Sequence, residues 1–332
     1  MLDRLTALGT RLGFEGMGCA LGRRLSVLTF HRVLAQPDRL RYGEPDVQQF
    51  DRMMRLISAS FVVLQMRQAI ELIKQNDLPR RALVISFDDG YADNAKLALP
   101  VLLRHGLVAT FYVSTGFLNG GRMWNDSVIE SIRGCTSERL DLGFLGLEEM
   151  HLPDDDARRS VIAVLLHRIK YLKLQERDAA VERLRIACGS PQLPSDLMMN
   201  PEQVRQLALA GMEVGGHTVS HPILTSLSRP EAEDEIRSGK QALEAMIQSS
   251  VSTFAYPNGK PDKDYDNSHV DIVKSLGFSG AVSTAKGVAA YGDDLFQLPR
   301  ISPWGATVAV WAFRLMQYYR RRDFSLAQKS GN

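Results

Sequence analysis

Residues 82–113, ALVISFDDGYADNAKLALPVLLRHGLVATFYV, carry the clearest local fold signal in the chain. Residues 82–87 are almost entirely apolar and predict a buried strand. A helix through Leu97, Val101 and Leu102 should end at Gly106, and residues 108–113 form a second apolar run of strand type. A strand, a helix and a second strand in this order predict a parallel βαβ unit.

The same alternation continues on both sides of this unit. Helices are expected after Asp46, after Asn200 and after Ser228, because each of these residues is a good helix N-cap. Pro201 and the Ser228-x-x-Glu231 capping box strengthen the second and third of these helix starts. The chain is therefore predicted to be an α/β protein with a parallel sheet, whose further strands lie at residues 26–30, 61–64, 213–215, 251–256 and 280–282.

Three segments depart from this alternation. Residues 121–199 are charged and helix-forming, which predicts a helical insertion that covers or flanks the site. Residues 1–25 should form an amphipathic N-terminal helix, and residues 304–332 a C-terminal helix and tail, leaving 26–303 as the main domain. Both terminal helices are expected to pack on that domain, but their apolar and basic residues could also contact a membrane surface.

Composition narrows the class of protein. The 332 residues are 45% hydrophobic and carry a formal net charge of +2, which gives no drive towards nucleic acid. Cys19, Cys135 and Cys188 lack any C-x-x-C spacing and are expected to be reduced thiols. The first residues make a poor secretory signal and no stretch is long and apolar enough for a membrane span, so we expect a cytoplasmic location.

Two adjacent carboxylates follow the apolar strand at 82–87. Asp88 and Asp89 lie where parallel α/β folds collect catalytic groups, at the carboxyl end of a strand. Like charges this close favour a bound divalent cation, which lets both stay ionised. The structural alternative is that Asp89-Gly90 makes a turn and Asp88 caps the next helix.

Two histidines four residues apart occur in the segment GGHTVSHP at 215–222. Pro222 disfavours helical geometry at His221, so the segment is predicted to be a loop. His217 and His221 alone could be a coincidence, but together with one carboxylate they make a ligand set. Such a triad leaves positions open for water and substrate, as a catalytic metal site requires.

These segments resemble a known family. SFDDG at 86–90 and HTVSH at 217–221 are similar to the first two motifs of the polysaccharide deacetylases, also called carbohydrate esterase family four or the NodB-homology family. FAYPNG at 254–259 resembles the third motif, and ATFYV at 109–113 also resembles the family. The resemblance covers residues 25–302 and implies a distorted (β/α) barrel of about seven parallel strands.

The resemblance also implies residue roles. Asp89, His217 and His221 would bind a divalent metal, usually Zn²⁺ in such enzymes, and Asp88 would be the general base for the metal-bound water. The chain lacks the family's late Leu-x-His motif, since no histidine follows His269. It is instead similar to the permuted subgroup that includes poly-N-acetylglucosamine deacetylases, in which an early histidine serves as the acid.

In that subgroup pattern His31, at the end of the first strand, would protonate the leaving amine, and its pKa near neutrality suits the task. The alternative is a histidine that only caps the strand by hydrogen bonds. The arginine that usually orients the catalytic aspartate is also missing from the third motif. Arg300 at the end of the barrel could replace it, or could be an ordinary surface arginine.

Four further residues are assigned to substrate binding. Trp124 and Asp126 lie where the insertion leaves the barrel and could stack on or hydrogen-bond a sugar, although Trp124 could equally pack in a core. Tyr256 and Pro257 belong to the third motif and are also assigned to substrate binding. No oligomeric state is predicted.

The expected function is hydrolysis of the N-acetyl group of a carbohydrate, whether polysaccharide, oligosaccharide or lipid-linked sugar. A first alternative keeps the fold and changes the substrate, to deformylation of a lipid-linked amino sugar or hydrolysis of a small amide. A second is a non-catalytic carbohydrate-binding protein, against which the intact Asp88 argues, because binding alone needs no base.

Overall fold

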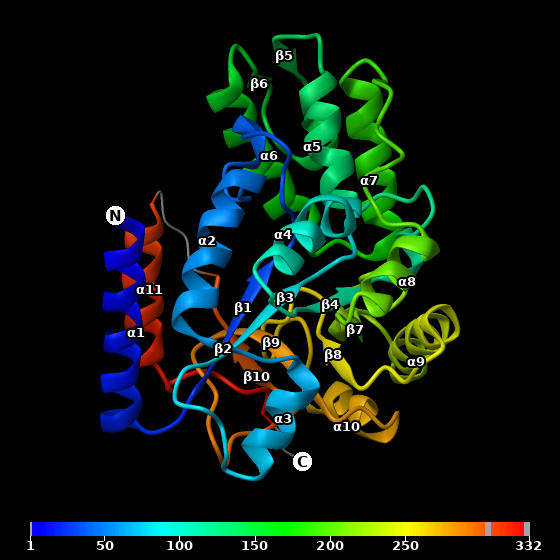
Figure 1. The fold of residues 1–332 in the computed structure, drawn as a ribbon. Coiled ribbons are helices and arrows are strands. Elements are labelled where there is room, and N and C mark those ends of the chain that lie inside the picture. The colour runs from blue at the N-terminus through cyan, green and yellow to red at the C-terminus, as the bar shows by residue number, and fades with distance from the viewer. Residues whose placement is uncertain (1, 303–306, 329–332) are drawn as a thin grey trace.

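A sheet of parallel strands curls into a nearly closed barrel at the centre of the molecule (Figure 1). The computed structural model describes residues 2–302 and 307–328. Every neighbouring pair of strands on the barrel path is parallel, which confirms the predicted fold class. In spatial order the strands are β1 (Leu25–Phe30), β3 (Ala82–Phe87), β4 (Thr110–Val113), β7 (Glu213–Gly216), β8 (Thr253–Ala255), β9 (Gly280–Lys286) and β10 (Leu298–Arg300).

The barrel closes between its first and last strands. Thr29 donates its backbone N–H to the carbonyl of Ile301 at 3.0 Å, and Ile301 donates to the carbonyl of Val27 at 2.7 Å. Short β2 (Val62–Val63) pairs with β3 outside this path. Because the strands are parallel, all their carboxyl ends lie at one end of the barrel, where the predicted site residues are placed.

Helices surround the barrel, and three of them begin at the predicted N-cap residues. Asp46 accepts a hydrogen bond from the Gln49 N–H, and Asn200 and Ser228 each form a capping box. The helix after Asp93 begins with a π-helical segment (Asn94–Ala98) rather than a regular α-helix. The helices are α2 (Val47–Ser60), α3 (Met66–Lys74), α4 (Leu99–Arg104), α8 (Pro201–Leu209), α9 (Arg229–Ile247) and α10 (Asn267–Ser275).

The part of the chain between β4 and α8 forms a separate helical lobe at the top of Figure 1. Its helices α5 (Trp124–Gly134), α6 (Asp155–Ile169) and α7 (Leu174–Ala187) bury their own apolar cluster, which includes Val128, Leu165 and Leu184. A short antiparallel pair, β5 (Arg139–Leu140) and β6 (Met150–His151), was not predicted. Residues of α5 and α6 reach the carboxyl end of the barrel.

The terminal helices lie side by side on the outside of α2 (Figure 1). Phe14 of α1 (Leu2–Leu21) packs between Phe61 and Tyr319, with ring centroids 4.7 and 5.1 Å away. Tyr319 ends α11 (Val308–Tyr319); residues 304–306 of the predicted C-terminal helix lie outside the described residues. Leu12 and Phe313 remain exposed, and membrane contact stays a prediction. Within residues 2–302 and 307–328, no helix is long and apolar enough to cross a membrane.

Candidate active site

A cavity of about 330 Å³ opens at the carboxyl end of the barrel. Several strands contribute to its wall: Asp88 and Asp89 follow β3, His217 follows β7, and His31 follows β1. The helical lobe closes another side of the cavity through Met123, Trp124, Asn125, Leu166, His167 and Lys170. The cavity therefore lies between the barrel and the lobe.

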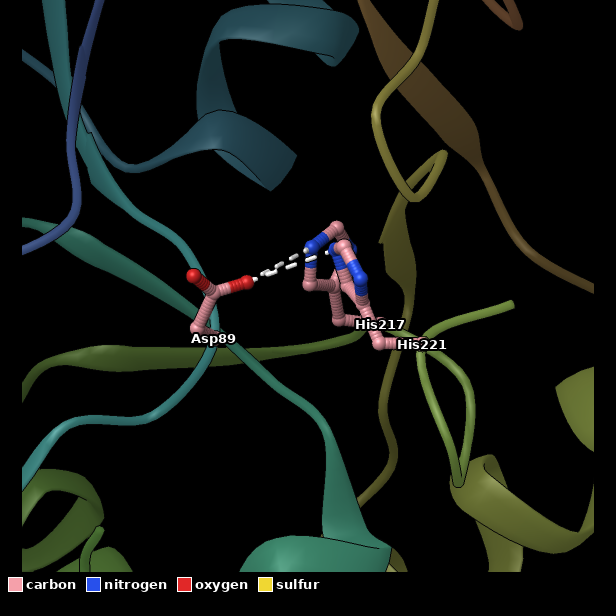
Figure 2. A group of neighbouring side chains, drawn as sticks. All are labelled: Asp89, His217 and His221. Atoms are coloured by element: carbon pink, nitrogen blue, oxygen red, sulfur yellow. Dashed lines mark ion pairs between the residues drawn. The ribbon is translucent and has the colours of Figure 1, made fainter. Parts of the chain in front are cut away.

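Asp89, His217 and His221 come together as a compact triad (Figure 2). Oδ1 of Asp89 lies 3.4 Å from Nε2 of His217 and 3.4 Å from Nε2 of His221. Ligand atoms about 2.0–2.1 Å from a tetrahedral zinc ion lie about 3.3 Å from one another. The two distances from Asp89 therefore fit a common metal ion, and the three ligand atoms all lie within 4.8 Å of one another.

A hydrogen bond at Nδ1 of His217 determines the tautomer of this ring, and therefore whether Nε2, which faces Asp89, carries a proton or a lone pair. Nδ1 of His217 lies 2.7 Å from the carbonyl oxygen of Ala255, and because a carbonyl only accepts, Nδ1 must carry the proton. In the neutral ring Nε2 then presents a lone pair to the carboxylate of Asp89. Two acceptors face each other, an arrangement that a cation between them stabilises.

The electrostatics of the triad suit metal ligands. Burial lowers the pKa of His221 to about 3, against the attraction of Asp89, so this imidazole is neutral at physiological pH. A neutral imidazole and an ionised carboxylate are the forms that bind a metal.

The loop between the two histidines is held in an uncommon backbone conformation. Thr218 and His221 have φ angles of 66° and 51°, in the left-handed region. Glu235 of α9 accepts hydrogen bonds from the N–H groups of Val219 and Ser220, both at 2.9 Å. Gly239 lets α9 approach, because a Cβ there would lie 2.9 Å from the backbone of Thr218.

Asp88 is paired with Arg300, the last residue of β10. Nη1 and Nη2 of Arg300 each donate to a different carboxylate oxygen at 2.7 Å, and Arg300 Nε donates to the carbonyl of Ser283 at 2.9 Å. Both side chains are almost fully buried. Burial would raise the pKa of Asp88, but Arg300 outweighs it and the net shift is downward, so the carboxylate is ionised and able to accept a proton.

His31 faces the same cavity and is solvent-exposed within it. Its surroundings lower the pKa by desolvation, but the carboxylates of Asp89 and Asp88 raise it more, so the net shift is upward. The loop that carries His31 is anchored by Asn94, whose Nδ2 donates to the His31 carbonyl at 2.9 Å. The imidazole is thus placed where it can exchange a proton with a molecule in the cavity.

The predicted substrate residues divide into one that reaches the cavity and three that do not. Trp124 lines the cavity and is half-buried. The assignments of Asp126, Tyr256 and Pro257 are corrected, since all three are buried and none lines the cavity. Tyr256 stacks on Tyr265 with ring centroids 3.9 Å apart, so its ring belongs to the core.

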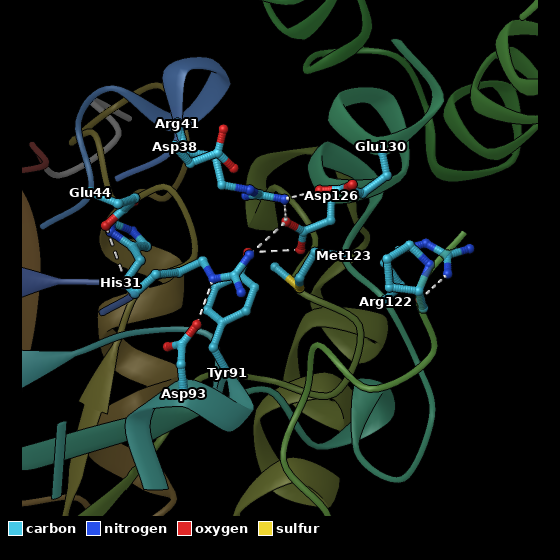
Figure 3. Close-up of polar contacts among 12 residues, drawn as sticks. His31, Asp38, Arg41, Glu44, Tyr91, Asp93, Arg122, Met123, Asp126 and Glu130 are labelled. Carbon is cyan, nitrogen blue, oxygen red and sulfur yellow. Dashed lines mark hydrogen bonds and ion pairs between the residues drawn. The ribbon is translucent and has the colours of Figure 1, made fainter. Parts of the chain in front are cut away.

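Asp126 instead joins the helical lobe to the barrel (Figure 3). It accepts hydrogen bonds from Nη2 of Arg41 at 2.7 Å and from the hydroxyl of Tyr91 at 2.9 Å. Tyr91 follows the Asp88-Asp89-Gly90 segment, and Arg41 belongs to the loop after β1. A fully buried carboxylate with these partners positions α5, and with it Trp124, over the cavity.

Other cavity residues were not predicted. Asn258 belongs to the third motif, where its positive φ of 59° marks a turn, and it lines the cavity with Thr284 of β9. The Asn258-Gly259 dipeptide is a turn signal in the sequence and could have suggested the former. Glu235 and Lys170 have no such signal, because their roles depend on how separate helices pack.

Comparison with known proteins identifies the family to which a chain with this fold and site belongs. A family model described as polysaccharide deacetylase matches residues 75–139 and 178–281, just over half of the chain. The chain therefore belongs to the polysaccharide deacetylase family. Among curated proteins it is 19% identical over 280 residues to YxkH of Bacillus subtilis (strain 168), whose name assigns it to the same class, covering 84% of this chain and 71% of that protein.

Solved structures share the fold. The deacetylase PplD of Streptococcus pyogenes, in complex with acetate, is 17% identical with a TM-score of 0.59 and covers 90% of this chain and 99% of its own. IcaB from Ammonifex degensii is 19% identical with a TM-score of 0.58, covering 88% and 97%. The BpsB deacetylase domain from Bordetella bronchiseptica is 15% identical with a TM-score of 0.52, covering 83% and 94%.

Proposed function

We propose that the protein is a metal-dependent deacetylase that hydrolyses the N-acetyl group of a carbohydrate. The observation that carries the proposal is the triad of Asp89, His217 and His221, in which Oδ1 of Asp89 lies 3.4 Å from Nε2 of each histidine, beside an aspartate that Arg300 keeps ionised. Family membership and the acetate bound to PplD support the acetamide as the reacting group. A protein that only bound sugar would have no use for Asp88.

Asp89, His217 and His221 would hold the metal, and their oxygen and nitrogen donors fit Zn²⁺ or a similar divalent ion. When bound, such an ion acts as a Lewis acid that polarises the acetamide carbonyl and acidifies water. The fixed tautomer of His217 and the low pKa of His221 keep both rings available as ligands.

Asp88 and His31 would transfer the protons of the reaction. Water adds to the acetamide carbon while Asp88 accepts one of its protons. The carbon–nitrogen bond then breaks, and His31 donates a proton to the departing nitrogen. The products are acetate and a free amino sugar, and the raised pKa of His31 favours the protonated form that an acid requires.

The test is acetate release from a panel of N-acetylated oligosaccharides, measured before and after chelator treatment and again after zinc is restored. We expect activity to fall at least about 100-fold with chelator and to return with zinc. The metal content of the same samples should follow the activity. Full turnover in chelated, metal-free protein would contradict the proposal, and acetate release from no N-acetyl sugar would refute the substrate class.

A further inference from the structure

Three lysines gather at the rim of the catalytic cavity. Lys170, which follows α6, lines the cavity itself. Its Nζ lies 5.4 Å from the centroid of the Tyr171 ring, and Nζ of Lys263 lies 4.0 Å from the same centroid. Lys260 lies on the same loop as Lys263, which follows β8 and the cavity residue Asn258. Two separate elements thus bring positive charge to one aromatic ring beside the cavity.

A fourth cation lies in the helical lobe next to the cavity wall. Arg177 of α7 has its guanidinium carbon 5.5 Å from the centroid of the Trp124 ring, and Trp124 lines the cavity. Arg177 is only 5% exposed, and its buried Nε has no hydrogen-bond partner among the described residues. A buried, incompletely paired guanidinium is costly unless another group compensates it.

This cluster, which we name the basic rim (Lys170, Arg177, Lys260 and Lys263), has carboxylates nearby, including Asp178, whose charge acts on Arg177. In the described ranges 2–302 and 307–328, no ion pair within 4.0 Å joins any of the four to a carboxylate. Asp264 attracts Lys170, but it is fully buried and accepts the backbone N–H of Lys260 at 3.0 Å. Burial lowers the pKa of Lys170, and the charges of Lys260 and Lys263 lower it further.

Half of the rim, Lys170 and Arg177, lies where this chain differs from the general family pattern, whereas Lys260 and Lys263 lie in a matched segment. The family model leaves residues 140–177 unmatched, and that interval contains Lys170, Tyr171 and Arg177. The metal-ligand candidates and Asp88 lie inside the matched segments. A feature of the unmatched lobe that faces the catalytic cavity is suited to selecting a substrate rather than to the shared chemistry.

We propose that the basic rim binds an anionic group, a phosphate or a carboxylate, carried by the N-acetyl sugar that the cavity receives. This proposal rests on the proposed function, which supplies the N-acetyl sugar as substrate. The new claim is that this sugar carries a negative charge. Lys170 would contact the anion within the cavity, and Lys263 would contact it from the opposite element. The purely structural role of Lys170 is to follow the C-terminus of α6, where a cation is favourable, and that role predicts no preference for charge.

Binding should be measured by calorimetry on chelator-treated protein, which prevents turnover and removes any metal that could itself bind phosphate. The probes are methyl N-acetyl-β-glucosaminide, which is neutral, N-acetylglucosamine 1-phosphate, and N-acetylmuramic acid, which carries a carboxylate. The variants are Lys263→Gln and Lys170→Gln. The matched control is Lys74→Gln, which makes the same charge change at the end of α3, just before β3.

We expect at least one anionic probe to bind about tenfold more tightly than the neutral glycoside. Lys263→Gln and Lys170→Gln should each lower the affinity for that anionic probe about threefold to tenfold relative to the affinity for the neutral probe. Lys74→Gln should leave the ratio of the two affinities unchanged. Whichever of phosphate and carboxylate shows the effect identifies the anion. Equal affinity for charged and neutral probes would overturn the proposal that the basic rim binds an anion. An equal loss of affinity in Lys74→Gln would also overturn it.

The outcome is separable from that of the deacetylase proposal. If anionic probes bind selectively but no sugar releases acetate with zinc restored, the deacetylase proposal fails while the anion site stands. If neutral N-acetyl sugars are deacetylated without preference for charge, the deacetylase proposal stands and the anion site fails. Thermal melting of each variant would show that it is folded.

Discussion

Arg300 and Asp88 are 212 residues apart in the chain and form a two-point ion pair in the interior of the barrel. The planar guanidinium matches both carboxylate oxygens at once, so the orientation of Asp88 is fixed as well as its charge. The carbonyl of Ser283 holds the third donor of the same guanidinium.

Arg300→Lys should therefore impair catalysis although the positive charge remains. A single ammonium cannot hold both oxygens, so we expect kcat to fall about tenfold to 100-fold and stability to fall by about 1–3 kcal/mol. Steady-state kinetics and denaturant unfolding measure the two effects. Arg237→Lys, which changes a half-exposed pair on α9, is the matched control and should be nearly neutral.

Asp88→Asn should abolish turnover and retain the metal. The amide cannot accept the proton from water, so the loss should be about 100-fold to 10,000-fold, the range for a general base. Acetate release and metal content are measured on the same samples. Normal turnover by this variant would refute the assigned base, and loss of metal instead would make Asp88 a ligand.

His31→Gln should lower turnover much more than metal content. The glutamine keeps a polar side chain but donates no proton at neutral pH, so we expect kcat to fall about 100-fold with metal bound as before. A substrate whose leaving amine needs no protonation should recover most of the loss. His105→Gln, at an Asp51 ion pair away from the cavity, provides the comparison. Metal loss in His31→Gln would assign His31 to the metal.

Glu235→Gln should weaken metal binding without touching a ligand. The carboxylate accepts two backbone N–H groups and the Ser220 hydroxyl, which hold the His217–His221 loop in its left-handed turns. We expect the metal affinity to fall about tenfold, the lower part of the range for groups that orient ligands. A competition assay with a chromophoric chelator measures it. Glu233→Gln, two residues earlier on the same helix, should change nothing, and equal effects of both would point to charge alone.

Local sequence signals predicted much of the fold. The βαβ unit at 82–113 and the caps at Asp46, Asn200 and Ser228 appear where expected, because strand and helix patterns and capping depend on residues close in sequence. The π-helical segment at 94–98 and the β5–β6 pair were not predicted. Both depend on how the lobe and the barrel pack rather than on a local pattern.

The candidate site was predicted in part for the same reason. Asp88, Asp89, His217 and His221 lie in short motifs, and the structure brings them together. From the sequence, Arg300 could be either the partner of Asp88 or an ordinary surface arginine, because its pairing with Asp88 requires the barrel to close. It placed Tyr256 and Asp126 on the substrate, whereas packing against Tyr265, and hydrogen bonds from Arg41 and Tyr91, bury them. These contacts join segments that no local pattern relates.

The closure between β1 and β10 has a consequence for the order in which the molecule is assembled. During synthesis Asp88 emerges early, but its partner Arg300 and the strand that seals the barrel emerge more than 200 residues later. Until then a carboxylate meant for the interior has no counter-charge. A nascent chain therefore cannot hold a finished catalytic centre, and the protein can become active only when its last strand has left the ribosome.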